Sequence, residues 1–161
     1  MPENTISIGH FVFNFCTNLT HINFSKKLVF IGEAAFQGTA ILSAKIPHGV
    51  KSIMEGTFAN CTSLENVEFS EGVEVIEWQS FANCLKITSL KIPETTTFIG
   101  HEAFINCRCL TAFVIPQNVE TIEYDVFKNC DSLSEIVIMK PENSISGSPW
   151  GAVNAEITWE N

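Results

Sequence analysis

Hydrophobic residues recur along this chain with a period of 22 or 23 residues. In one unit, Val67 and Phe69 alternate with polar residues, which is the spacing of a β-strand and not of a helix. A second apolar pair, Val73 and Ile76, follows after a turn, and four residues then lead to Phe81. Each unit is therefore predicted to hold two short extended segments joined by tight or 3₁₀ turns. The ring-bearing position of successive units is held by Phe13, Phe36, Phe58, Phe81, Phe104, Phe127 and Trp150.

A fixed period of this length is typical of stacked copies of one small unit. A single unit cannot cover its own apolar side chains, so neighbouring units must bury them between one another. We therefore predict a solenoid that is mainly parallel β, with right-handed stacked rungs about 4.8 Å apart. The ring-bearing residues should then form a single interior column.

The position two residues after each ring is expected to be a turn residue with positive φ, because asparagine and glycine tolerate that conformation. It is held by Asn60, Asn83, Asn106, Asn129 and Gly38. The next position is held by Cys16, Cys61, Cys84, Cys107 and Cys130, with Thr39 in one unit. Stacked cysteines lie within disulfide distance, but their side chains point the same way. A straight column also lacks the tetrahedral convergence that zinc needs, so we predict reduced, structural thiols. Cys109 lies off this pattern and is expected to be exposed.

Residues 99–107 (Ile-Gly-His-Glu-Ala-Phe-Ile-Asn-Cys) resemble the BspA-type leucine-rich repeat of bacterial and protist surface proteins. Residues 31–36 match the same motif, and the resemblance extends over nearly the whole chain. It implies a leucine-rich-repeat solenoid with parallel strands on a concave face. It also implies a role in adhesion or recognition at the cell surface or after secretion, with no catalytic residues and no cofactor.

The length of 161 residues suits a single domain. Residues 1–139 are predicted to form the solenoid, as a partial first rung and about six units. Residues 140–161 are predicted to form a C-terminal cap, because Glu142 replaces an apolar residue and residues 146–149 break the motif. Ala155 to Trp159 would supply a last strand. The N-terminus enters in mid-repeat, which indicates a piece of a longer solenoid or an end that a partner or the leading segment covers.

Nine basic and eighteen acidic residues give the chain a formal net charge of −9. This balance disfavours nucleic acid and anionic membrane surfaces as partners. The sequence has no apolar run long enough to insert into a membrane, and its first residues do not resemble a leader. A cytoplasmic location therefore remains an alternative to the cell surface, and the oligomeric state is open.

Two rows of outward positions are candidate partner-binding surfaces. On the first strand of each unit these positions are His21, Asn23, Ser43, Lys45, Asn66, Glu68, Ser89 and Lys91. Two residues after the repeat isoleucine, Trp78, His101 and Tyr124 occupy three consecutive units. Exposed aromatic residues are common in partner contacts. The first row could instead be a plain solvated sheet that binds no partner. The rings of the second row could instead cover apolar atoms of their own rung.

The sequence thus predicts a non-catalytic recognition or adhesion module that binds a protein or a glycan. The alternative is a structural spacer within a longer cell-surface chain. An enzyme is disfavoured because the four histidines occupy different rows of the repeat and no nucleophile or phosphate-loop motif is present.

Overall fold

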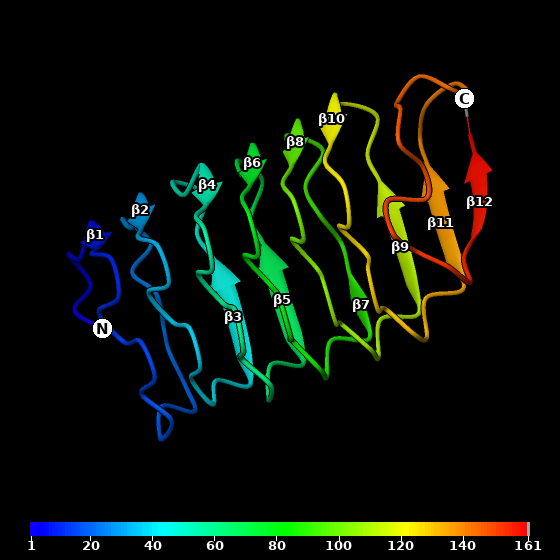
Figure 1. The fold of residues 1–161 in the computed structure, drawn as a ribbon. Coiled ribbons are helices and arrows are strands. Elements are labelled where there is room, and N and C mark those ends of the chain that lie inside the picture. The colour runs from blue at the N-terminus through cyan, green and yellow to red at the C-terminus, as the bar shows by residue number, and fades with distance from the viewer. Residues whose placement is uncertain (161) are drawn as a thin grey trace.

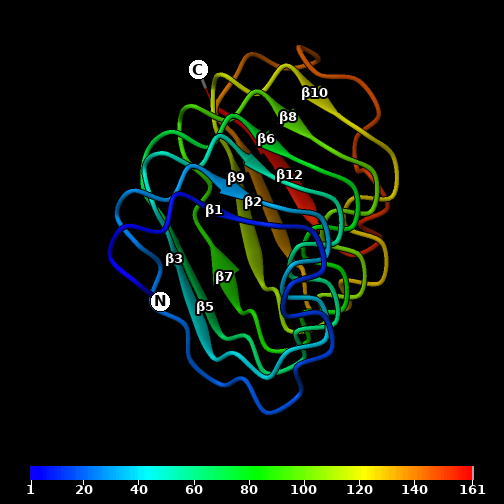
Figure 2. The same ribbon diagram turned by 90° about the vertical axis from the view of Figure 1, so that its left-hand side faces the viewer.

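The computed structural model describes residues 1–160 as a β-solenoid of about seven turns, with no helix among those residues (Figure 1). The two ends of the chain lie at opposite ends of the stack. Seen end-on, successive rungs overlap, and strands lie along two sides of the outline (Figure 2). The predicted fold of stacked, mainly parallel β rungs is confirmed.

The first-strand face carries the strands that alternation predicted. These are β3 (Ser43–Ile46), β5 (Asn66–Phe69), β7 (Ser89–Leu90), β9 (Ala112–Ile115), β11 (Glu135–Ile138) and β12 (Glu156–Trp159). Their paired members run parallel, as β3 with β5 and as β7, β9, β11 and β12 in one sheet. The alternation places one set of side chains in the core and the next in solvent.

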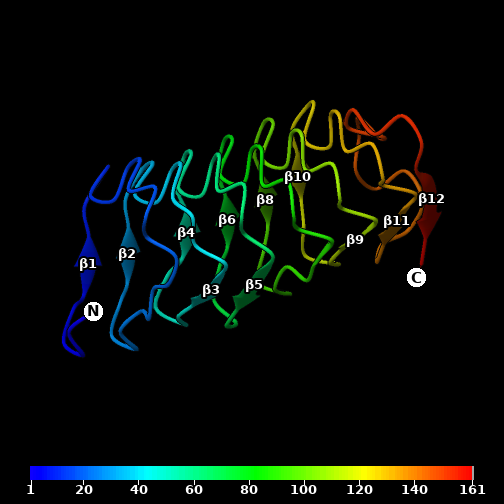
Figure 3. The ribbon, with the colours of Figure 1, turned by 90° about the horizontal axis from the view of Figure 1, so that it is seen from below.

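The second side of the solenoid, called here the flank, consists of two-residue strands in a row (Figure 3). These are β1 (Ser7–Ile8), β2 (Phe30–Ile31), β4 (Ser52–Ile53), β6 (Val75–Ile76), β8 (Phe98–Ile99) and β10 (Thr121–Ile122). Parallel pairing sets Ile53, Ile76, Ile99 and Ile122 side by side in one buried row. The ladder is interrupted between β2 and β4, at the single 22-residue step of the repeat.

The ring-bearing residues form the predicted interior column. Successive phenylalanine rings from Phe13 to Phe127 stack with centroids 5.2–6.1 Å apart and interplanar angles of 6–18°. Phe13 is only half-buried, because its rung lies at the end of the stack. All the other members are buried, and they are Phe36, Phe58, Phe81, Phe104, Phe127 and Trp150.

Each rung from that of Phe13 to that of Phe127 turns with two left-handed residues, of which the sequence predicted one. The predicted one lies two residues after the ring, where φ is between 59° and 69° at Gly38, Asn60, Asn83, Asn106 and Asn129. The second lies two residues before the ring and is held by Phe11, Ala34, Gly56, Gln79, Glu102 and Asp125. Left-handed residues are incompatible with a 3₁₀ helix. The connections in residues 1–160 are accordingly tight turns, with bonds such as Ala82 N to Gln79 O (3.0 Å), and none is a 3₁₀ helix.

The turn asparagines also form a side-chain ladder that the pattern did not predict. The Nδ2 of Asn83 donates to Oδ1 of Asn60 at 2.9 Å. Asn106 donates to Asn83 at 2.7 Å, and Asn129 donates to Asn106 at 2.8 Å. Asparagine therefore satisfies two requirements at once, a left-handed backbone and an amide that both donates and accepts along the stack.

Two substitutions at Asn83 should separate those requirements. Asn83→Gly keeps the left-handed backbone and removes both amide bonds, so we expect the free energy of unfolding to fall by about 1–2 kcal/mol. Asn83→Ala removes the same bonds and adds the strain of φ at 60°, so the loss should be larger by about 1 kcal/mol. Urea denaturation measures both. Equal stability of the alanine variant and the wild type would contradict the prediction.

The predicted last strand is present as β12, which pairs with β11 over four residues. Glu142 is exposed, as a residue facing solvent should be. The boundary between a solenoid at 1–139 and a cap at 140–161 stays a prediction, and Asn161 lies outside the described residues.

Candidate functional site

Trp78, His101 and Tyr124 form a continuous row on the flank, called here the aromatic column. They follow β6, β8 and β10, each two residues after a buried isoleucine. The ring centroids of Trp78 and His101 lie 6.2 Å apart with planes 23° from parallel, and those of His101 and Tyr124 lie 3.8 Å apart. Trp78 is 42% exposed and Tyr124 is 67% exposed. The two outer rings therefore face solvent, whereas the His101 side chain between them is only 19% exposed.

Hydrogen bonds fix the middle ring of this column. The Nδ1 of His101 lies 2.9 Å from the carbonyl oxygen of Tyr124. Because a carbonyl can only accept, Nδ1 carries the proton and donates it. The backbone N–H of His101 donates to Oε2 of Glu123 at 2.7 Å. His101 thus has a set orientation before any partner arrives, and the rings of Trp78 and Tyr124 lie against it on either side.

Gly100 allows the rungs to approach closely beneath the column. A Cβ at this position would lie 2.8 Å from the backbone nitrogen of Trp78 and 2.9 Å from the carbonyl carbon of Glu77. Both are backbone atoms that cannot swing aside, so glycine is required for this spacing. The sequence motif Ile99-Gly100 therefore has a direct role in bringing Trp78 and His101 together.

Carboxylates lie along the same rungs as the aromatic column. Glu55 occupies the column's position one rung before Trp78, and Glu77 and Glu123 lie directly before Trp78 and Tyr124. Burial raises the pKa of Glu77, and the nearby charges of Glu123, Glu55 and Glu33 raise it further. Negative charge is consequently concentrated on this part of the flank.

The eight candidate residues of the first-strand face are all exposed, as expected. They are His21, Asn23, Ser43, Lys45, Asn66, Glu68, Ser89 and Lys91. Only Ser43, Lys45, Asn66, Glu68 and Ser89 lie within strands. The predicted strand around residues 19–24 does not form, and β7 ends at Leu90, so Lys91 lies just beyond it. In the register of β3 with β5, Lys45 faces Glu68, and Nζ lies 3.1 Å from Oε2.

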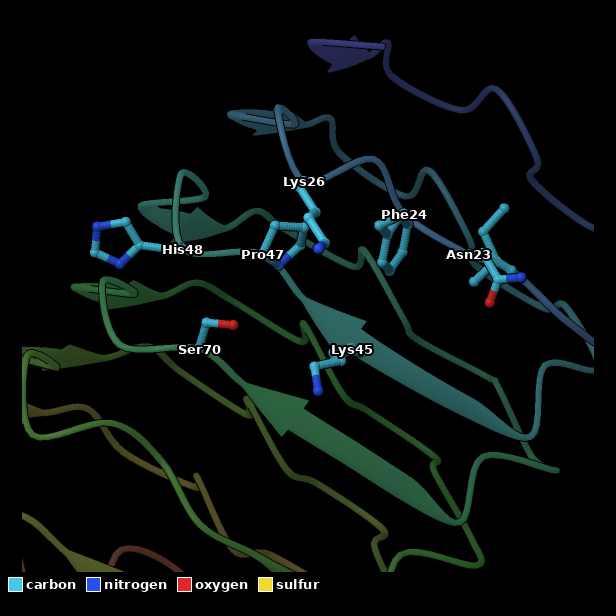
Figure 4. A pocket seen from close by; sticks show the side chains of 8 residues that line it. Asn23, Phe24, Lys26, Lys45, Pro47, His48 and Ser70 are labelled. Atoms are coloured by element: carbon cyan, nitrogen blue, oxygen red, sulfur yellow. The ribbon is translucent and has the colours of Figure 1, made fainter. Parts of the chain in front are cut away.

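A hollow of about 430 Å³ brings Asn23 and Lys45 together on this face. Figure 4 shows Phe24, Pro47 and Lys26 close to one another, with His48 directly after Pro47 and Ser70 on the next rung. A second hollow, of about 310 Å³, includes Ser89, Lys91, Val114 and Pro116. Both hollows were missed from the sequence, because their walls come from residues of different units.

The four thiols of the repeat column are buried and hydrogen-bonded, as structural groups should be. Each Sγ donates to the carbonyl of the ring-bearing residue in the preceding unit, at 3.0–3.3 Å. Burial raises the pKa of all four, and that of Cys130 reaches about 12. A buried neutral thiol is a poor nucleophile. Cys109 is exposed as expected, and Cys16 is exposed because its rung is at the end of the stack.

Among residues 1–160, no three His, Cys, Asp or Glu side chains gather in a way that could hold a metal ion. The same part of the chain forms no helix of the length and apolar character needed to cross a membrane.

Comparison with known proteins identifies the repeat. A family model described as "BspA type Leucine rich repeat region" matches in six copies, over residues 1–109 and 30–150. A search of curated proteins finds no significant match to the chain.

Several solved structures share the fold. A leucine-rich repeat protein from Bacteroides ovatus is 19% identical with a TM-score of 0.61, over 100% of this chain and 53% of that one. The leucine-rich repeat protein of T. pallidum is 21% identical with a TM-score of 0.68, over 100% and 67%. The pneumococcal vaccine antigen PcpA is 17% identical with a TM-score of 0.72, over 89% and 42%. The chain therefore spans between about two fifths and two thirds of the length of these proteins.

Proposed function

Because the chain belongs to the BspA-type leucine-rich repeat family, we propose that it is a non-catalytic recognition module that binds a protein or glycan partner. The place proposed for it is the cell surface or the exterior, to which the similarity with a vaccine antigen lends support. The observation that carries the proposal is the continuous aromatic column of Trp78, His101 and Tyr124, whose outer rings, Trp78 and Tyr124, are exposed.

Three properties of the column support a binding role. Trp78 and Tyr124 offer large rings to solvent, and such residues contribute disproportionately to interfaces. His101 is held by bonds to Tyr124 O and Glu123 Oε2, so little conformational freedom remains to be lost on binding. The core does not require rings here, since Glu33 and Glu55 occupy the same position in two other units.

The first-strand face is proposed as a second contact surface. Its two hollows include Asn23 and Lys45 in one case and Ser89 and Lys91 in the other. Parallel repeats commonly present such a face to partners, because equivalent positions line up along the stack.

The second candidate function is a structural spacer in a longer surface chain. The N-terminal rung favours it, since Ile6, Phe11, Val12 and Phe15 are each more than half exposed. An apolar end of this kind can be covered by a further rung.

The binding proposal can be tested with a printed glycan array and a random-peptide display library, each screened with the wild type. The Trp78→Ala/Tyr124→Ala variant should bind the selected ligands at least about tenfold more weakly, because buried aromatic contacts carry most of an interface's free energy. Val153→Ala is the matched control, because Val153 is 84% exposed and lies outside the column. If every selected ligand binds the double variant as tightly as the wild type, the column has no role in recognition.

A further inference from the structure

The stacking of the aromatic column leaves one face of each end ring open. Trp78 and His101 are stacked, so one face of the indole is turned toward His101 and the other toward the rung that holds Glu55. Tyr124 has His101 beside it on one side only, and it is 67% exposed, so much of its ring is open to solvent. The end rings are therefore the ones that can receive a group from outside.

The charged residues at the positions next to Trp78, in its own unit and in the preceding one, are acidic. Glu55 lies one rung before Trp78, and Glu77 directly precedes Trp78 in the chain. Among the described residues, neither glutamate side chain has a hydrogen bond or an ion pair. The lysines of neighbouring rungs are already paired, Lys51 with Glu74 at 2.9 Å and Lys128 with Asp125 at 2.8 Å.

A Lys or Arg side chain would suit both the open ring faces and the unpaired carboxylates. A cation is attracted to the face of an indole or phenol ring within about 6 Å, and tryptophan is the strongest such partner. The same cation would lie beside the Glu55 carboxylate, at a site where like charges now repel one another. The net charge of −9 adds a long-range field that attracts basic molecules.

The spacing of the rungs limits the shape of the partner. Trp78 and Tyr124 are two rungs apart, which is about 10 Å at the separation of neighbouring strands. An extended peptide covers the same distance in about three residues. The cations would lie a few Å beyond the outer face of each ring. Two arginines three positions apart could therefore reach both end rings if their long side chains splay apart.

We infer that the aromatic column binds an extended basic segment of a partner protein, with one cationic side chain between Trp78 and Glu55 and a second against Tyr124. This inference rests on the proposed function, because it names the partner class for the same site. It excludes acidic peptides as ligands of the column and makes binding dependent on ionic strength.

The test uses N-acetylated, amidated Gly-Arg-Gly-Gly-Arg-Gly, immobilised at high density so that avidity raises a weak single contact to a measurable one. The wild-type chain should bind this surface, and a surface of the corresponding glutamate peptide should not retain it. Raising the salt concentration from about 0.02 M to about 0.5 M should weaken binding at least tenfold, since the contact is solvent-exposed and screened.

Two variants separate the rings from the charges. Trp78→Ala should weaken binding about tenfold. Glu55→Gln/Glu77→Gln leaves the rings intact and should weaken it severalfold. Glu3→Gln/Glu160→Gln is the matched control, since both residues are exposed and lie before β1 and after β12, so it changes the net charge by the same amount away from the column and should leave binding unchanged.

The outcomes distinguish this inference from the proposed function. Absent binding, or binding that Trp78→Ala and Glu55→Gln/Glu77→Gln leave unchanged, overturns the basic partner. A neutral glycan that is lost in Trp78→Ala/Tyr124→Ala but retained in Glu55→Gln/Glu77→Gln also overturns it, while the recognition function stands. Equal losses in both glutamate double variants would show a non-specific effect of net charge and overturn it as well.

Discussion

Replacing Phe81 with alanine should lower the free energy of unfolding by about 3–5 kcal/mol, the range for removing a buried phenylalanine. The ring is fully buried and stacks on Phe58 and Phe104, at 5.4 Å from each. It also meets Phe69 edge-to-face at 6.1 Å. The cavity left by the substitution cannot collapse easily, because backbone hydrogen bonds to the next rung hold both sides of the turn. Phe81 N, for example, donates to Ala103 O at 2.9 Å.

Phe13→Ala is the matched control for this effect. Phe13 occupies the same position of the repeat, but it is half-buried and stacks on one phenylalanine of the column, Phe36. We expect it to cost about half as much or less, since a partly exposed ring gives up less apolar area. Urea denaturation of both variants measures the difference. Equal losses would show that the stability of a rung does not depend on neighbours on both sides.

The comparison also tests how stability is distributed along the stack. In a repeat protein, each unit contributes its own folding free energy and a term for each neighbour. Phe81 lies in the middle and takes part in two interfaces, whereas Phe13 takes part in one. A broad, multistep transition in Phe81→Ala would indicate that the two halves of the solenoid unfold separately once this link is weakened.

Features that repeat with the 23-residue period could be predicted from the sequence. The ring column, the left-handed asparagines and the buried thiols each need one residue type at one position, so the requirement is visible in every unit. The second left-handed residue could not be predicted, because no single residue type recurs at its position. Ala34, Gln79 and Glu102 share no side-chain property, and the turn is imposed on them by the hydrogen bonds between rungs.

Features formed across different units could be predicted only in part. The aromatic column was found because three consecutive units carry a ring at a position where other units carry glutamate. Its exposure depends on ring orientations that the spacing of the repeat cannot give. The hollow around Asn23 and Lys45 carried no signal, because Phe24 and Pro47 also occupy ordinary positions of the repeat. The missing strand near residue 22 reflects a rung at the end of the stack, where ladder pairing is incomplete.

The column of buried thiols should make the protein progressively less stable at alkaline pH. Burial raises the pKa of Cys61, Cys84, Cys107 and Cys130 from an ordinary value of 9.0, to about 12 at Cys130. Neighbouring thiols raise it further at Cys84, where Cys107 and Cys61 lie on either side. In the folded chain these groups therefore stay protonated at pH values where the unfolded chain has already ionised them.

The sign of the effect follows from proton binding. Above pH 9 the unfolded chain holds fewer protons than the folded chain, so raising the pH favours unfolding. The stability contributed by the thiols is fully present below pH 9 and is lost as the pH rises toward the folded-state value of about 12 at Cys130. Each thiol contributes a slope of at most about 1.4 kcal/mol per pH unit. The three whose pKa is raised most, Cys84, Cys107 and Cys130, together approach about 4 kcal/mol per pH unit.

Urea denaturation at pH 8, 9, 10 and 11 under reducing conditions measures this slope. Cys130→Thr should reduce it by about one third, that is by about 1.4 kcal/mol per pH unit. Threonine is the suitable replacement, because Thr39 already occupies this position in one unit and donates to Phe36 O at 2.9 Å. Cys109→Ser, outside the column and exposed, should leave the slope unchanged. A flat stability profile between pH 9 and pH 11 would mean that the thiols ionise equally well in the folded chain, and that the interior of the stack is open to water.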